Sequence, residues 1–151
     1  MDDNRKYAAA IAHYEARDFA IAFAAFSELA LRDHAESISL LASMYAAGEG
    51  VTQDIAKSME LDLKAIGLGS LTSRANLAVT LLQIGKPDEA EFWFREAIAA
   101  GDDDANLDLA KLKLSQNAAG PEVPNLLRAV VASDTATPAS KEEAEEILRA
   151  L

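Results

Sequence analysis

The 151-residue sequence has no cysteine, only four prolines and seven glycines, and few aromatic side chains. Without cysteine the chain can form neither disulfides nor thiolate metal sites, which suits a reducing compartment. Basic residues are also scarce, since 14 Lys and Arg stand against 25 Asp and Glu, for a net charge of −11. Affinity for nucleic acid depends on neutralising phosphates, so this charge disfavours DNA or RNA as a partner. It is consistent with a solubilising acidic surface or with steering towards a basic partner.

Long hydrophobic runs are missing as well. The longest mostly apolar stretch, residues 19–31, includes Ser27 and Glu28 and is too short to cross a bilayer. Residues 1–6 lack the basic-then-apolar order of a secretory signal. We therefore expect a cytoplasmic protein that does not associate with membranes.

Apolar residues make up half of the sequence, and most of them are alanine and leucine. Both are strong helix formers, and small side chains let helices approach closely. Glycine and proline stand mainly between the periodic segments. The composition thus predicts an all-α fold, with residues 1–151 forming a single domain.

Small and apolar residues recur at a spacing of 32 residues, lengthened once to 36. One series is Leu29, Ala65, Ala97 and Ala129, and the second is Ala9, Leu41, Leu77 and Leu109. In both series the long step spans residues 48–53, so one longer loop explains both. Such a period is typical of stacked helical repeats, in which each unit buries its apolar face against its neighbours.

Helical periodicity and turn residues predict about four helix pairs followed by one capping helix. The expected helices cover residues 3–16, 18–31, 35–47, 55–66, 72–84, 87–100, 104–116, 125–132 and 141–151. We expect Gly48 to end the third helix and Asp54 to cap the fourth. Pro121 and Pro124 are expected to break the fourth pair, and Ser140 with Glu143 reads as a capping box.

The second pair carries a family pattern. Residues 41–54 read LASMYAAGEGVTQD and are followed by Lys64-Ala65 and Gly69. Residues 35–70 resemble the Sel-like repeat, a variant of the tetratricopeptide repeat with a longer, glycine-containing turn between its helices. Residues 17–26 and 86–94 fit the plain tetratricopeptide pattern loosely. The resemblance implies a right-handed α-solenoid of antiparallel helix pairs that binds proteins or peptides, generally without catalysis.

In this superfamily the first helix of each pair lines the inner curve of the solenoid. Aligning the four first helices places these residues on that curve: Tyr7, Ile11 and Tyr14; Ser39, Ser43 and Ala46; Ala75, Val79 and Leu82; Leu107, Lys111 and Leu114. Most of them are apolar, so they either pack on one another or form a groove for a partner segment. The partner-binding residues that we predict are Tyr7, Ile11, Tyr14, Ser39, Ser43, Val79, Leu82 and Lys111.

No motif predicts catalysis, a metal site or a cofactor. Asp102, Asp104 and Asn106 alternate as in a calcium loop, but Leu107 and Lys113 occupy the positions that require glycine and glutamate. We expect the aspartates to cap a helix instead. With two histidines in separate helices or turns and no cysteine, we expect no zinc site.

The aromatic residues near the middle of the chain suggest both core and surface roles. Phe94 aligns with Phe26 and is expected in the core. The adjacent Trp93 either packs as well or is an exposed contact residue of the kind that dominates binding energies.

The sequence therefore predicts a non-catalytic interaction module that binds a protein or peptide partner on its concave helical surface. The acidic charge of the chain is compatible with a basic partner. The alternative is an immunity or inhibitor protein that neutralises a basic toxin through its acidic surface. The sequence identifies no cofactor for either function.

Overall fold

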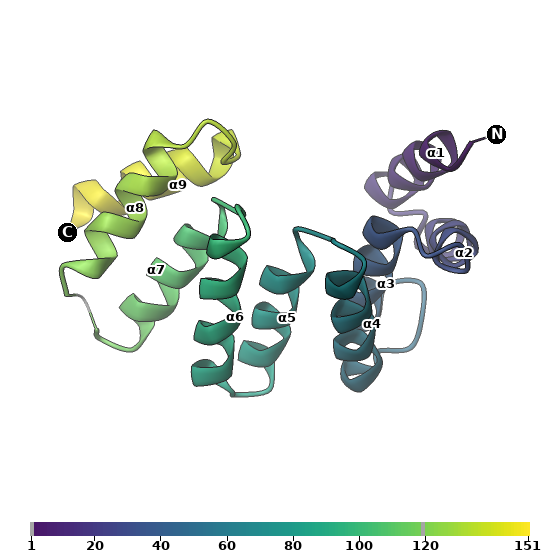
Figure 1. Ribbon diagram of the computed structural model, residues 1–151, viewed down its shortest axis with the longest axis horizontal. Helices are drawn as coiled ribbons and strands as arrows, with labels where there is room; N and C mark the ends of the chain where they lie inside the picture. Colours follow the sequence, from purple (N-terminus) through teal and green to yellow (C-terminus); the bar gives the residue numbers. More distant parts are fainter. Residues whose placement is uncertain (1, 119) are drawn as a thin grey trace. The chain divides into compact units, whose positions relative to one another are not determined.

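The computed structural model describes residues 2–118 and 120–151, and over these residues it contains nine α-helices and no strand (Figure 1). In chain order the helices are α1 (Asp3–Glu15), α2 (Phe19–Ala30), α3 (Ala35–Ala47), α4 (Ile55–Gly67), α5 (Ser73–Gln83), α6 (Pro87–Ala99), α7 (Ala105–Ser115), α8 (Glu122–Ala132) and α9 (Pro138–Ala150). The predicted all-α class and the number of helices are confirmed over the described residues.

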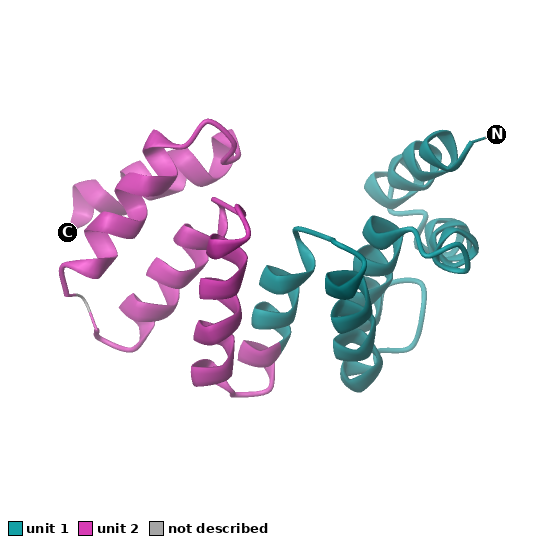
Figure 2. Ribbon diagram, viewed as in Figure 1, with its two compact units in different colours: residues 1–80 teal, residues 81–151 magenta. Residues whose placement is uncertain are grey.

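The chain packs as two compact units, residues 1–80 and residues 81–151 (Figure 2). In the first unit α1 packs on α2, α2 on α3, and α3 on α4. In the second unit α6 packs on α7, α7 on α8, and α8 on α9. Each of these helices therefore packs on the next one along the chain within its unit, as a fold built of helix pairs requires.

The second helix of each pair buries one row of three residues spaced at i, i+4 and i+7, which is one face of an α-helix. The rows are Ala22, Phe26 and Leu29 in α2; Ser58, Asp62 and Ala65 in α4; Ala90, Phe94 and Ala97 in α6; and Val123, Leu127 and Val130 in α8. The third members are separated by 36, 32 and 33 residues. The predicted anchor Ala129 is exposed, and Val130 takes its place because the register of α8 is shifted by one residue.

In the first helices of the pairs, too, the buried alanine lies one residue from the predicted position. Ala9 is exposed, whereas the buried alanines are Ala10, Ala42, Ala78 and Ala110, which keep the predicted steps of 32, 36 and 32 residues. Leu41, Leu77 and Leu109 are buried as expected. Ala9 instead lines an open groove between α1 and α2.

The helix ends around the long turn follow the sequence prediction. Gly48 has a φ of 71° and ends α3 in the left-handed conformation that favours glycine. The Asp54 carboxylate accepts a hydrogen bond from the backbone N–H of Lys57 at 2.9 Å and so caps α4. Both predictions are confirmed.

The last two helices begin earlier than predicted. α8 starts at Glu122 and α9 at Pro138, each three residues ahead of the expected start. Pro124 lies in the first turn of α8. The backbone N–H groups of a first turn have no partner within the helix, so a proline there costs no hydrogen bond. The Thr137 side chain, not Ser140, caps α9 by accepting from the Ser140 backbone N–H. The predicted capping box is therefore wrong.

The capping role expected for the aspartates before α7 holds for Asp102, whose carboxylate accepts from the backbone N–H groups of Ala105 and Asp104, but not for Asp103 and Asp104. Asp104 is the N-cap residue, but its side chain makes no capping hydrogen bond. Its carboxylate accepts from the backbone N–H of Thr137 at 2.9 Å, and the Asp103 carboxylate accepts from the Ser133 hydroxyl at 2.6 Å. These carboxylates thus fasten the α8–α9 loop to the start of α7.

Candidate functional site

Three of the predicted contact residues form a strip along α1. Tyr7, Ile11 and Tyr14 are spaced at i, i+4 and i+7, and each is half-buried against the core of the first unit. The rings of Tyr7 and Tyr14 both contact Phe26, with centroids 6.0 and 6.4 Å apart. The strip is therefore a set of partly exposed side chains whose inner edges are fixed by packing.

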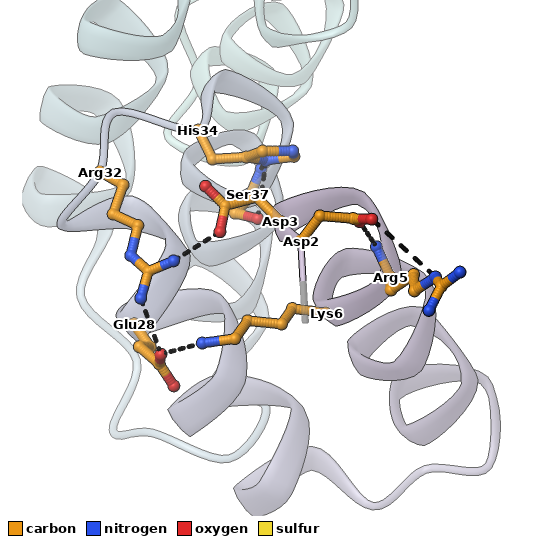
Figure 3. Close-up of polar contacts among 8 residues, drawn as sticks. All are labelled: Asp2, Asp3, Arg5, Lys6, Glu28, Arg32, His34 and Ser37. Carbon is orange, nitrogen blue, oxygen red and sulfur yellow. Dashed lines mark hydrogen bonds and ion pairs between the residues drawn. The ribbon is translucent and has the colours of Figure 1, made fainter.

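Ion pairs hold α1 against the end of α2. Figure 3 shows Lys6 pointing towards Glu28, and Arg32 lying between Glu28 and Asp3. The Lys6 ammonium lies 2.5 Å from the Glu28 carboxylate, and the Arg32 guanidinium donates to Asp3 at 2.6 Å and to Glu28 at 3.3 Å. All four side chains are partly exposed, so we expect the pairs to orient the helix more than to stabilise the fold.

The two tyrosines of the strip differ in their polar partners. The Tyr14 hydroxyl donates to Glu49 in the long turn at 2.8 Å. Burial and then this bond to Glu49 raise the pKa of Tyr14 to about 12. The Tyr7 ring lies 4.9 Å from that of His34, and its pKa is raised by burial and by the charge of Glu36. Both tyrosines therefore stay neutral, with hydroxyl groups able to donate, across the physiological range.

Ser39 and Ser43 belong to a hydrogen-bonded link between α3 and α5. The Asn76 side-chain amide donates to the Ser39 hydroxyl at 3.1 Å and to the Ser43 hydroxyl at 3.3 Å. Ser39 also shares a hydrogen bond of 3.1 Å with Thr72 and is only 2% exposed, whereas Ser43 is half-buried. Ser39 thus acts mainly in holding the two helices together, and Ser43 and Asn76 remain partly accessible.

Sequence reasoning missed Asn76, although a signal for it was available. At the equivalent positions α1 has Ala8 and α3 has Leu40, although α7 has Asp108, so the amide of α5 stands where the two preceding first helices are apolar. Such a change on a half-buried helix face indicates a polar contact with a neighbouring helix.

The remaining predicted contacts lie on α5 and α7. Val79 is 43% exposed, while Leu82, in the last turn of α5, is half-buried. The Lys111 ammonium pairs with Glu143 of α9 at 2.9 Å. Leu107, one turn before Lys111, is buried in a cluster that includes Ala144 of α9. The α7 positions are therefore engaged with α9, in contrast to the open strip on α1.

Trp93 and Phe94 divide between surface and core. Phe94 is buried as predicted, and Trp93 is half-buried. The Trp93 ring packs edge-on against Phe92 with centroids 5.4 Å apart, and Phe92 is 55% exposed. The most exposed aromatic side chain of this segment is thus one that the sequence analysis did not single out.

Within residues 2–118 and 120–151 no group of three or more His, Cys, Asp or Glu side chains is placed to hold a metal ion. Over the same residues, every helix is too short or too polar to span a membrane.

The fold matches solved Sel-like repeat structures. A Sel1 repeat protein from Oxalobacter formigenes superimposes with a TM-score of 0.70 at 18% identity, over 97% of this chain and 62% of that protein. A protective antigen of uropathogenic Escherichia coli with the SLR fold superimposes with a TM-score of 0.74 at 22% identity, over 99% of this chain and 33% of the antigen. No family model and no curated protein matches the sequence. This chain spans less than two thirds of either solved protein.

Proposed function

We propose that this chain, which has the Sel-like repeat fold, is a non-catalytic interaction module that binds a protein or peptide partner. The proposed contact surface is the exposed side of α1, α3 and α5 within residues 2–80, defined by Tyr7, Ile11, Tyr14, Ser43, Asn76 and Val79. We call it the α1–α3–α5 surface.

The observation that carries the proposal is the Tyr7, Ile11 and Tyr14 strip. Tyrosine supplies a large contact area at a small cost in conformational entropy, and it is enriched among the residues that dominate binding energies. Here the aromatic rings are already held by Phe26 and, for Tyr14, by Glu49. A surface whose side chains are fixed before binding loses less entropy when the partner docks.

The hydrogen bonds between α3 and α5 support the same surface. They fix Ser43 and Asn76 beside one another on neighbouring helices, with Val79 on the turn after Asn76. The surface thus combines apolar side chains with a few placed polar groups, as peptide-binding sites commonly do. On α7 the corresponding Lys111 is instead paired with Glu143, so the proposed surface does not include it.

A double substitution tests the proposal. The partner is first recovered by affinity capture from native cells and purified, and its dissociation constant is then measured for the wild type and for Ile11→Ala/Val79→Ala. We expect the constant to rise by about ten-fold or more, because two apolar contacts are truncated.

The matched control is Ile21→Ala/Leu31→Ala, which truncates two exposed apolar residues outside the surface, one in α2 and one directly after it. Circular dichroism and thermal unfolding check that both variants fold. Equal affinities for the wild type and the Ile11/Val79 variant would exclude the α1–α3–α5 surface as the binding site.

A further inference from the structure

One repeat departs from the pattern of buried residues on the second helices. The middle residue of the buried row is apolar in three of these helices and acidic in the fourth: Phe26, Phe94 and Leu127, against Asp62 in α4. In the same row Ser58 stands where α2 and α6 have alanine. The α4 row thus places a carboxyl group and a hydroxyl where α2 and α6 bury an aromatic ring and a methyl group.

These polar groups are buried without compensation. Ser58, Asp62 and Ser73, the first residue of α5, have no exposed surface. Among the residues that the structure describes, neither Asp62 carboxyl oxygen has a hydrogen-bond partner, nor does either serine hydroxyl. A buried polar group without a partner is costly, and a buried charge without a partner is far more so.

The charged and titratable groups on the helices around Asp62 have contacts of their own. They are Glu36 and Tyr45 on α3, Lys57, Glu60 and Lys64 on α4, and Arg74 on α5. Lys57 pairs with Glu60, Lys64 with Asp33, and Glu36 accepts from Thr72. Arg74 donates to the backbone carbonyl of Ser70. No ion pair among residues 2–80 that the structure describes includes Asp62.

We propose that Ser58, Asp62 and Ser73 form a proton-sensitive joint between α4 and α5. The joint is closed when Asp62 carries a proton, because the neutral acid is compatible with a buried site and can donate a hydrogen bond to a serine hydroxyl. When Asp62 ionises, its charge has no cation to pair with, and α4 and α5 separate locally so that water reaches the carboxylate.

Because Asp62 is buried, its ionisation takes place near neutral pH. Burial raises the pKa of Asp62 to about 7, and the nearby Ser73 hydroxyl lowers it only partly. The pKa in the folded protein thus exceeds that of the unfolded chain, so the folded state keeps a proton that the unfolded state loses. Stability from this group is complete at acidic pH and declines as the pH rises towards about 7.

The joint adjoins the link between α3 and α5. Ser73 lies one helical turn before Asn76, whose amide bonds to Ser39 and Ser43. Opening the joint would therefore disturb the α1–α3–α5 surface. That consequence rests on the proposed function, whereas the joint itself is tested without any partner.

Amide hydrogen exchange of the full chain at about pH 5.5 and about pH 8.5 tests the joint, after correction for the pH dependence of intrinsic exchange. We expect the amides of α4 and the first turn of α5 to lose protection by about ten-fold or more at the higher pH. In Asp62→Asn, which keeps the shape without the charge, protection should be the same at both values. The matched control Glu60→Gln removes an exposed carboxylate from the same helix and should behave as the wild type does.

Infrared spectroscopy adds a direct readout of the proton on Asp62 in the wild type. The wild type at about pH 5.5 should show a protonated carboxyl band that Asp62→Asn lacks and that fades towards about pH 8.5. Equal protection at the two pH values in the wild type would overturn the joint. So would a pH-dependent loss of protection that persists in Asp62→Asn, or in Asp62→Leu should the asparagine variant not fold.

Discussion

Gly50 in the long turn is constrained both by its backbone conformation and by its surroundings. Its φ is +70°, and a Cβ added there would lie 2.5 Å from the carbonyl oxygen of Phe19. Gly69 also has a positive φ, +93°, but a Cβ on it would meet nothing within 4 Å. A side chain at Gly50 would therefore cause both backbone strain and steric overlap, whereas one at Gly69 would cause backbone strain alone.

We expect Gly50→Ala to lower the free energy of unfolding by about 3 kcal/mol or more, and Gly69→Ala by about 1 kcal/mol. The first variant combines strain with displacement of the Phe19 backbone, and the second has strain alone. Urea unfolding followed by circular dichroism measures both. A Gly50 variant no less stable than the Gly69 variant would show that the turn shifts away from Phe19 freely.

Individual residues also show where the sequence was readable and where it was not. Gly48 and Asp54 act locally, so their roles as helix terminator and cap could be predicted. The burial of Asp62 was not predicted, although steps of 36 and 32 residues align this residue with Phe26 and Phe94. Its burial depends on tertiary packing, and an isolated aspartate on a helix is ordinarily expected to face solvent.

At the scale of helices, the start of α9 depends on its cap. The Thr137 hydroxyl accepts from the Ser140 N–H, and it lies 2.9 Å from the Ser140 hydroxyl and 3.3 Å from the Asp104 carboxylate as possible acceptors. The Ser140 hydroxyl itself caps no backbone group. We expect Thr137→Ala to cost about 1 kcal/mol of stability and Ser140→Ala less than about 0.5 kcal/mol. Thermal unfolding of the two variants measures the difference. The reverse order would restore the capping box predicted from the sequence.

A second link between elements joins α6 to α7. The Lys113 ammonium lies 2.7 Å from the Glu91 carboxylate, and both side chains are mostly buried. Lys113, and then Arg95, lower the pKa of Glu91 in the folded protein. Stability from this pair is therefore present above the usual pKa of glutamate and is lost as the pH falls through the lowered value.

We expect Lys113→Met, which keeps the apolar stem, to cost about 1 kcal/mol at neutral pH and less in acid, where Glu91 is protonated. Lys111→Met is the control, because its pair with Glu143 is about half exposed and should contribute less than about 0.5 kcal/mol. Denaturant unfolding at several pH values measures both. A loss for Lys113→Met that does not change with pH would point to packing and not to charge.

At the scale of the whole molecule, the spacing of the repeats identified the fold more reliably than any single residue did. The 32-residue period survives in the buried alanines of the first helices, because one structural unit recurs. The period could not predict the one-residue shift in the register of α8, which follows the loop that contains Pro121. Apolar periodicity gives the spacing within a helix but not the length of the connection before it. The right-handed course of the solenoid and the partner-binding residues stay predictions.

If the repeats are stabilised mainly by their neighbours, damage to one core cluster should stay near that cluster. Phe26 is buried in the first unit and Leu127 in the second. We expect Phe26→Ala to lower local stability around α1, α2 and α3 by about 3–5 kcal/mol. Leu127→Ala should remove about 2–5 kcal/mol around α7, α8 and α9. Hydrogen exchange resolved by segment measures both effects. A uniform loss of protection along the chain in either variant would mean that the two compact units unfold as one cooperative body, because the weakened cluster would then set the stability of every amide.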